Sequence, residues 1–66
     1  MKIGELEIAE FDLAVYRKQY KYCKDAIENG NWDNYSESLK IRKEQLQVLS
    51  EIIELLEIKI KRLKNK

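Results

Sequence analysis

The chain has 66 residues, with no histidine, no proline, one cysteine and two glycines. These absences exclude the common zinc ligand sets and an internal disulfide. The sequence also lacks a glycine-rich phosphate loop, and Ser36, Ser38 and Ser50 have no histidine that could activate them. The carboxylates are interspersed with lysines, as on solvated helix faces. We therefore expect no enzymatic activity, no metal and no cofactor.

Neither charge sign dominates, and long apolar runs are missing. With 13 basic and 12 acidic residues, the net charge is +1, which gives no global signal for nucleic acid. No apolar stretch approaches the ~20 residues of a membrane span. The first five residues carry an early acid and no apolar run, unlike a signal peptide. We expect a cytoplasmic protein with a reduced thiol.

The chain does contain a sustained apolar repeat with 3-4-3-4 spacing. This spacing averages 3.5 residues, so the repeated positions lie in one row along the helix, here called the seam, and can stay in contact with a second helix. The second half carries it at Trp32, Tyr35, Leu39, Arg42, Leu46, Leu49, Ile53, Leu56, Ile60 and Leu63. The first half carries it at Leu6, Ala9, Leu13, Tyr16, Tyr20, Cys23 and Ile27. The sequence thus predicts an all-α fold, an antiparallel hairpin of two long helices in a single domain, 1–66.

One break separates the two helices, at Asn29, Gly30 and Asn31. We expect Gly30 to adopt the left-handed conformation that closes a helix, and Asn31 to cap the next one, with Asp33 in its first turn. The predicted bounds are 5–28 for helix 1, 29–31 for the turn and about 32–63 for helix 2. Gly4 is the expected N-cap of helix 1.

A second apolar stripe accompanies each seam. Its members are Ile8, Phe11, Val15 and Tyr22 in helix 1, and Ile41, Val48, Ile52 and Leu55 in helix 2. A hairpin uses one stripe per helix, so a lone hairpin would leave the second stripe in water. Helix 2 is also expected to extend about 10 Å past helix 1. Its apolar residues there, Ile58, Ile60 and Leu63, would need another partner. Both features predict a homodimeric four-helix bundle.

Charge suggests the direction of that dimer. In a tight hairpin, position i should lie near position 60 minus i. Basic residues would then cluster near the turn: Arg17, Lys18, Lys21, Lys24, Lys40, Arg42 and Lys43. Acidic residues would form a band farther away: Glu5, Glu7, Glu10, Asp12, Glu51, Glu54 and Glu57. Packing with turns at opposite ends would pair opposite charges, so we predict an antiparallel homodimer.

The same basic residues, together with Trp32, are the candidate contacts to a partner protein or a nucleic acid. Tyr16, Tyr20 and Tyr22 lie among them, and such interleaving can bind a phosphate backbone with base stacking. In size and layout the chain is similar to the plasmid RNA-binding Rop hairpin dimers. That resemblance implies a nucleic-acid-binding regulator as an alternative function. The basic end at 59–66 could also contact an acidic partner, although cations suit a helix C-terminus in any case.

Four individual residues have more than one interpretation. Arg42 interrupts the seam. It could snorkel to solvent, stack on a tyrosine, bind an anion or fix the register. Cys23 is expected to be a small buried hydrophobe, with an inter-subunit disulfide or redox sensor as alternatives. Trp32 and Tyr35 should close the open end of the hairpin or act as interface anchors.

The expected function is a small non-enzymatic module that acts through protein–protein contacts. A regulator, inhibitor or assembly factor fits, and the small size and Lys/Ile/Asn-rich composition suit a phage, plasmid or small bacterial operon. Nucleic-acid binding through the turn-proximal basic residues is the alternative. A structural subunit of a larger helical assembly is the third.

Overall fold

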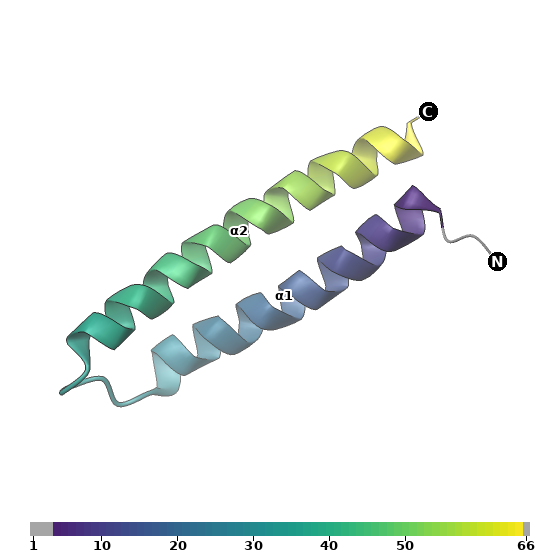
Figure 1. Cartoon of the computed structure of the whole chain (residues 1–66). Helices are drawn as coiled ribbons and strands as arrows, with labels where there is room; N and C mark the ends of the chain where they lie inside the picture. The colour runs from purple at the N-terminus through teal and green to yellow at the C-terminus, as the bar shows by residue number, and fades with distance from the viewer. Residues whose placement is uncertain (1–3, 66) are drawn as a thin grey trace.

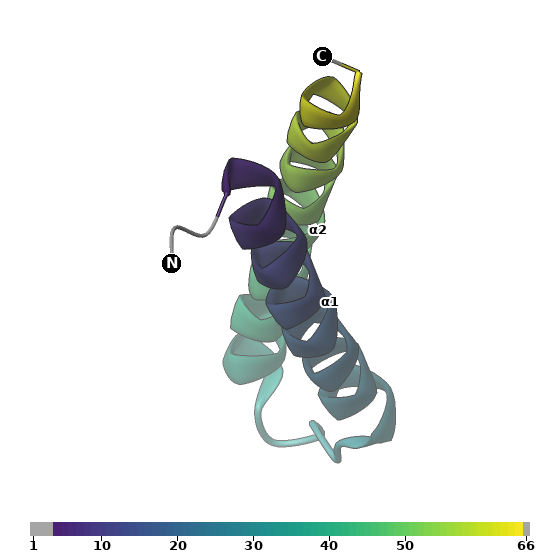
Figure 2. The same ribbon diagram turned by 90° about the vertical axis from the view of Figure 1, so that its right-hand side faces the viewer.

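The computed structural model describes residues 4–65 as two antiparallel helices joined by one turn (Figure 1). Helix α1 spans Glu5–Asn29 and helix α2 spans Ser36–Lys64. No strand occurs between residues 4 and 65. The prediction of an all-α helical hairpin is therefore confirmed. Both described chain ends lie at the end of the hairpin opposite the turn, and Figure 2 shows the two helix axes crossing.

The outer ends of the helices form as the local sequence predicts. Gly4 is the N-cap of α1 with an extended backbone, and Glu5 and Glu7 lie in the first turn, where they complement the helix dipole. The last turn of α2 contains the cations Lys61, Arg62 and Lys64, which complement its negative end. Lys66, the last residue of the predicted basic end, lies outside the described residues.

The turn is longer than predicted, because α2 begins at Ser36 rather than near Trp32. The cause is the indole of Trp32, which folds back onto the end of α1. Its Nε1–H donates a hydrogen bond to the carbonyl oxygen of Ala26 at 3.1 Å. The backbone N–H of Tyr35 then bonds to the carbonyl of Trp32 at 2.9 Å and closes a turn. Residues 30–35 therefore connect the helices.

The predicted roles of Gly30 and Asn31 are both wrong. Gly30 has φ −82° and ψ 152°, an extended conformation rather than a left-handed one. Position 30 requires glycine because a side chain would collide with its neighbours. A Cβ there would lie 2.6 Å from the Ala26 oxygen and 2.6 Å from the Trp32 Nε1. Asn31 does not cap α2, because its Oδ1 accepts a hydrogen bond from the backbone N–H of Asp33 at 3.3 Å. Tyr35 is the N-cap, and the acid in the first turn of α2 is Glu37 instead of Asp33.

The core lies toward the terminal end of the hairpin. Ala9, Leu13 and Ile60 form a buried cluster, against which other seam residues pack: Leu6, Ile53, Leu56 and Leu63. The expectation that Ile60 and Leu63 would extend beyond helix 1 is therefore wrong. The six-residue turn moves α2 back along α1, so the end of α2 reaches the first turns of α1.

The same shift changes the predicted register and, with it, part of the predicted charge pattern. The thiol of Cys23 contacts the carbonyl oxygen of Arg42 at 3.4 Å, so facing positions sum to 65 there instead of 60. Arg17, expected among the lysines of helix 2, forms an ion pair with Glu57 at 3.6 Å. The acidic start of α1 adjoins the basic end of α2, since Leu6 and Leu63 pack on one cluster. The predicted charge bands are therefore kept only in part, and the antiparallel dimer stays a prediction.

Candidate interaction surface

The two seams lie on the sheltered side of their helices. Between residues 4 and 65, every apolar seam residue within α1 and α2 is buried or half-buried. These residues are Leu6, Ala9, Leu13, Tyr16, Tyr20, Cys23 and Ile27 in α1, and Leu39, Leu46, Leu49, Ile53, Leu56, Ile60 and Leu63 in α2. Most are only half-buried, since each helix can cover just one side of the other. The seams thus account for the contact within the hairpin.

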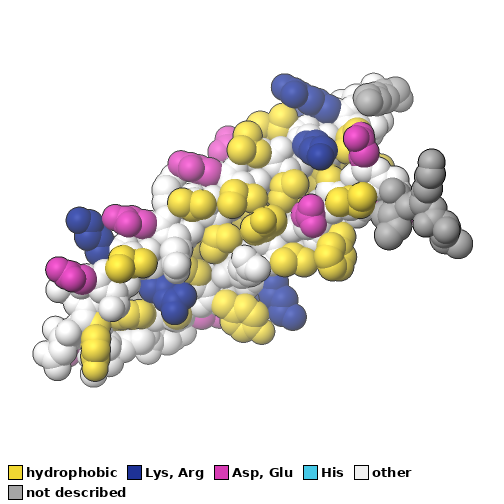
Figure 3. Space-filling model, viewed as in Figure 1, with side chains coloured by type: hydrophobic (Ala, Val, Ile, Leu, Met, Phe, Trp, Pro, Cys, Tyr) yellow, Lys and Arg dark blue, Asp and Glu magenta, His cyan; other side chains and the backbone are white. Residues whose placement is uncertain are grey.

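A second apolar surface, which we call the apolar face, remains exposed. It consists of Ile8, Phe11, Val15 and Tyr22 of α1, and Ile41, Val48, Ile52 and Leu55 of α2. All except the half-buried Ile52 are exposed, with Phe11 at 69% and Leu55 at 66%. Figure 3 shows apolar side chains spread over both helices on one side of the molecule. A hairpin that functioned alone would keep this surface in water at about 25 cal/mol per Å².

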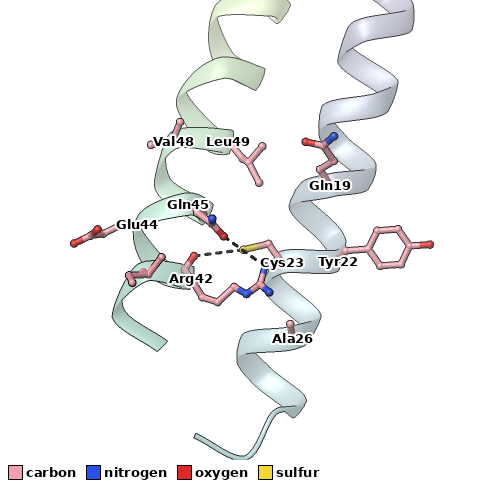
Figure 4. A pocket seen from close by; sticks show the side chains of 10 residues that line it. Gln19, Tyr22, Cys23, Ala26, Arg42, Glu44, Gln45, Val48 and Leu49 are labelled. Atoms are coloured by element: carbon pink, nitrogen blue, oxygen red, sulfur yellow. Dashed lines mark hydrogen bonds between the residues drawn. The ribbon is translucent and has the colours of Figure 1, made fainter. Parts of the chain in front are cut away.

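A groove opens in the apolar face near the turn, between the two helices (Figure 4). Its volume is about 830 Å³, and most of its lining is apolar: Tyr22, Cys23, Ala26, Ile41, Val48 and Leu49. The small side chains of Cys23 and Ala26 line it from α1, and Figure 4 shows the ring of Tyr22 pointing away from α2. Cys23 is 6% exposed, as expected of a small buried hydrophobe, and its S–H donates to the carbonyl oxygen of Arg42.

Arg42 lies at this groove with an exposed side chain. Its guanidinium Nη1 donates to Oε1 of Gln45 at 3.4 Å, within the same helix. Figure 4 shows the side chain extending from α2 toward α1. Arg42 is therefore not a buried residue of the seam, and its role as a contact to an anion or a partner stays a prediction. Its aliphatic stem and solvated head match the snorkelling interpretation.

The predicted basic patch is divided rather than continuous. Contact between Cys23 and Arg42 brings Lys24 to the level of the cations of α2 at 40–43. Arg17, in contrast, is paired with Glu57, closer to the terminal end. Tyr16 and Tyr20 are half-buried in the seam, which limits base stacking on their rings. Every candidate cation is exposed: Arg17, Lys18, Lys21, Lys24, Lys40, Arg42 and Lys43.

Trp32 and Tyr35 have different environments, although the sequence groups them together. Trp32 is half-buried, and its indole donates a hydrogen bond to the Ala26 carbonyl near the C-terminus of α1. Tyr35 is 62% exposed and precedes α2, so it is not part of the seam. A partner could therefore reach Tyr35 more readily than Trp32.

The described residues contain no group of three or more potential metal ligands. Neither described helix combines the length and apolar character needed to cross a membrane. No protein-family model, curated protein or solved structure matches this chain. The candidate interaction surface is therefore identified only from the exposure and chemistry of its side chains.

Sequence reasoning found the residues of the apolar face but missed the groove. The available signal was the pair Cys23 and Ala26, two small side chains one helical turn apart beside larger ones. The residues of helix 2 that face this pair are set by the register between the helices. The turn is longer than predicted, so that register differs from the predicted one. The groove therefore required the three-dimensional structure.

Proposed function

We propose that this protein is a non-enzymatic interaction module that self-associates through its apolar face into a four-helix bundle. The observation that carries the proposal is the exposure of seven large apolar side chains on that face. Single surface hydrophobes are ordinary, but seven large ones exposed along one side of two paired helices are typical of an interaction site.

The dimensions of the hairpin support the same proposal. It measures 50 by 21 by 14 Å, so it is one layer of helices rather than two. Domains usually bury their apolar faces between at least two layers. The 50 by 21 Å side has roughly 1,000 Å² in projection, above the ~800 Å² that each partner contributes to a standard interface. A second copy supplies an equally apolar, equally long face.

The dimer would present the charged outer sides of its helices to a further protein, as expected of a small regulator, inhibitor or assembly factor. Nucleic-acid binding has less support. Arg17 is paired with Glu57, and Tyr16 and Tyr20 are half-buried. Both features weaken the case for a cationic surface with stacking rings.

Sedimentation equilibrium of the purified chain tests self-association, and twice the chain mass is expected. Leu55→Glu places a charge within the apolar face and should shift the population to monomer. Ser50→Glu is the matched control, because Ser50 is an exposed residue on the other side of α2 and should tolerate the charge. A monomeric wild-type protein at high concentration would refute the proposal, as would a Leu55→Glu variant that dimerises like wild type. Larger masses would favour a subunit of a helical assembly.

A further inference from the structure

Two charged residues lie on the same side of the hairpin as the apolar face. A residue that directly precedes a seam residue lies about 100° around the helix on one side, and a residue that directly follows lies on the other. Tyr22 of α1 and Val48 of α2 precede seam residues, and both line the groove, so this side is shared by the two helices. Asp12 and Lys59 also precede seam residues. The side that we propose for self-association therefore carries one acid and one cation near the chain ends.

Asp12 is the only charged residue between positions 4 and 65 that is half-buried, and all the others are exposed. The only ion pair within the same range joins Arg17 to Glu57, which follow seam residues and so lie on the other side. A second copy that covers the apolar face would remove further water from the Asp12 carboxylate. An ionised group that loses water needs an opposite charge nearby. A partner copy that brings a cation to Asp12 is therefore favoured.

Two hairpins packed face to face can be related by a two-fold axis that runs along their length. Both turns then lie at the same end, and α1 of each copy packs on α2 of the other. Rotation about this axis leaves the height of every residue along the hairpin unchanged, so facing positions between copies follow the register of the hairpin itself. Those positions sum to about 69 at the terminal end, where Ala9 and Ile60 share the buried cluster. They sum to 65 where Cys23 contacts Arg42.

This register brings complementary polar groups together between the copies. Positions 12 and 59 sum to 71, two residues from the register at that end, which is a difference of ~3 Å in height. Gln19 and Gln45, which both line the groove, sum to 64, one residue from the register there. Asp12 of each copy thus lies beside Lys59 of the other, and the two amides face each other. Around the bundle α1 and α2 alternate, so the acids and cations alternate as well.

A two-fold axis across the hairpins gives a poorer match. It places α1 on α1 of the other copy, with the terminal end of each against the turn end of the other. On this side the turn end of α1 carries Gln19, Tyr22 and Ala26, none of which is a cation. Lys21 and Lys24 follow seam residues and lie on the other side. Asp12 would lose water in this arrangement without gaining an opposite charge.

We infer that the homodimer has both turns at the same end and that Asp12 of each copy pairs with Lys59 of the other. This inference rests on the proposed self-association and adds its geometry. It differs from the antiparallel dimer predicted from the sequence, which relied on a register that the hairpin does not have. The antiparallel dimer is therefore the rival arrangement in the experiments below.

Exchange of the two charges tests the contact between copies. Asp12→Lys and Lys59→Asp should each raise the dimer dissociation constant on the order of 10-fold, since two attractions become repulsions. An equimolar mixture of these two variants restores opposite charges only between unlike chains. Native mass spectrometry should therefore find mostly heterodimers.

The matched control is a mixture of Glu10→Lys and Lys61→Asp. These variants carry the same charge changes at residues that follow seam residues, on the other side of the hairpin. Their mixture should give the statistical proportions of the three dimers. Equal heterodimer fractions in the two mixtures would overturn the inference, as would single variants that dimerise like wild type. Circular dichroism of each variant separates lost association from lost folding.

A distance measurement tests the arrangement without any change of charge. A spin label on Asn34→Cys, in a Cys23→Ala background, reports the separation of the two turns. The inferred dimer predicts a separation below half of the 50 Å length of the hairpin. A separation that approaches the full length would overturn the inference in favour of the antiparallel dimer and leave self-association intact. A monomer would overturn both.

Discussion

Gly30→Ala tests whether close approach, rather than backbone conformation, requires glycine in the turn. The φ of −82° at this position is accessible to alanine, so the backbone itself sets no penalty. The new methyl group would, however, lie 2.6 Å from the Ala26 oxygen and 2.9 Å from Cε2 of Trp32. Both neighbours are constrained, the oxygen by the helix and the indole by its hydrogen bond. The turn must therefore shift.

The magnitude follows from two opposing effects. Overpacking by one methyl group costs about 1–3 kcal/mol, whereas alanine restricts the unfolded chain and returns about 0.4–1 kcal/mol. The net expectation for Gly30→Ala is a loss of about 1 kcal/mol, or roughly 4–8 °C in the melting temperature of a domain this small. Thermal unfolding followed by circular dichroism, at one fixed protein concentration, measures it.

Gly4→Ala provides the comparison. A Cβ at position 4 meets nothing within 4 Å, and the residue is the N-cap of α1. Alanine is a poorer N-cap than glycine, but the unfolded-state gain offsets most of that loss. The melting temperature of Gly4→Ala should therefore stay close to that of the wild type. A Gly30→Ala variant as stable as Gly4→Ala would refute the requirement for close approach in the turn.

Three further substitutions have expected effects on urea unfolding. Trp32→Phe removes the donor to the Ala26 carbonyl and should cost about 0.5–1.5 kcal/mol, and no change would contradict a role for that bond. Leu13→Ala empties part of the buried cluster and should cost about 2–4 kcal/mol, whereas a cost below that of Trp32→Phe would place the core elsewhere. Glu57→Gln breaks the exposed ion pair with Arg17 and should cost less than ~1 kcal/mol, and a larger loss would show that the pair is part of a wider network.

Periodicity was sufficient to predict the helices and the side of each that is sheltered. Leu13 and Ile60 illustrate why: a seam repeated over many turns is determined by spacing alone, whatever the partner. Phe11 and Leu55 were equally predictable as a second stripe, because their spacing excludes them from the first. The start of α1 followed from local chemistry, with an N-cap glycine and two acids in the first turn.

The turn was not predictable in the same way. The sequence Asn-Gly-Asn carries a strong local signal for a helix end followed at once by a new helix start. The structure instead follows a contact between two residues that are six positions apart, the hydrogen bond from the Trp32 indole to the Ala26 carbonyl. Trp32 and Tyr35 also fit the seam spacing by position, although both precede α2. Spacing alone does not distinguish the first turn of a helix from residues just before it.

The error in the turn had its largest effect far from the turn. A connection of six residues instead of two or three shifts every facing pair between the helices. The shift places Arg17 beside Glu57, where the predicted register had set Arg17 among the cations of helix 2. The spacing within α1 does not depend on that register. The two exposed apolar stripes are therefore set by the spacing within each helix, which a change in turn length leaves intact.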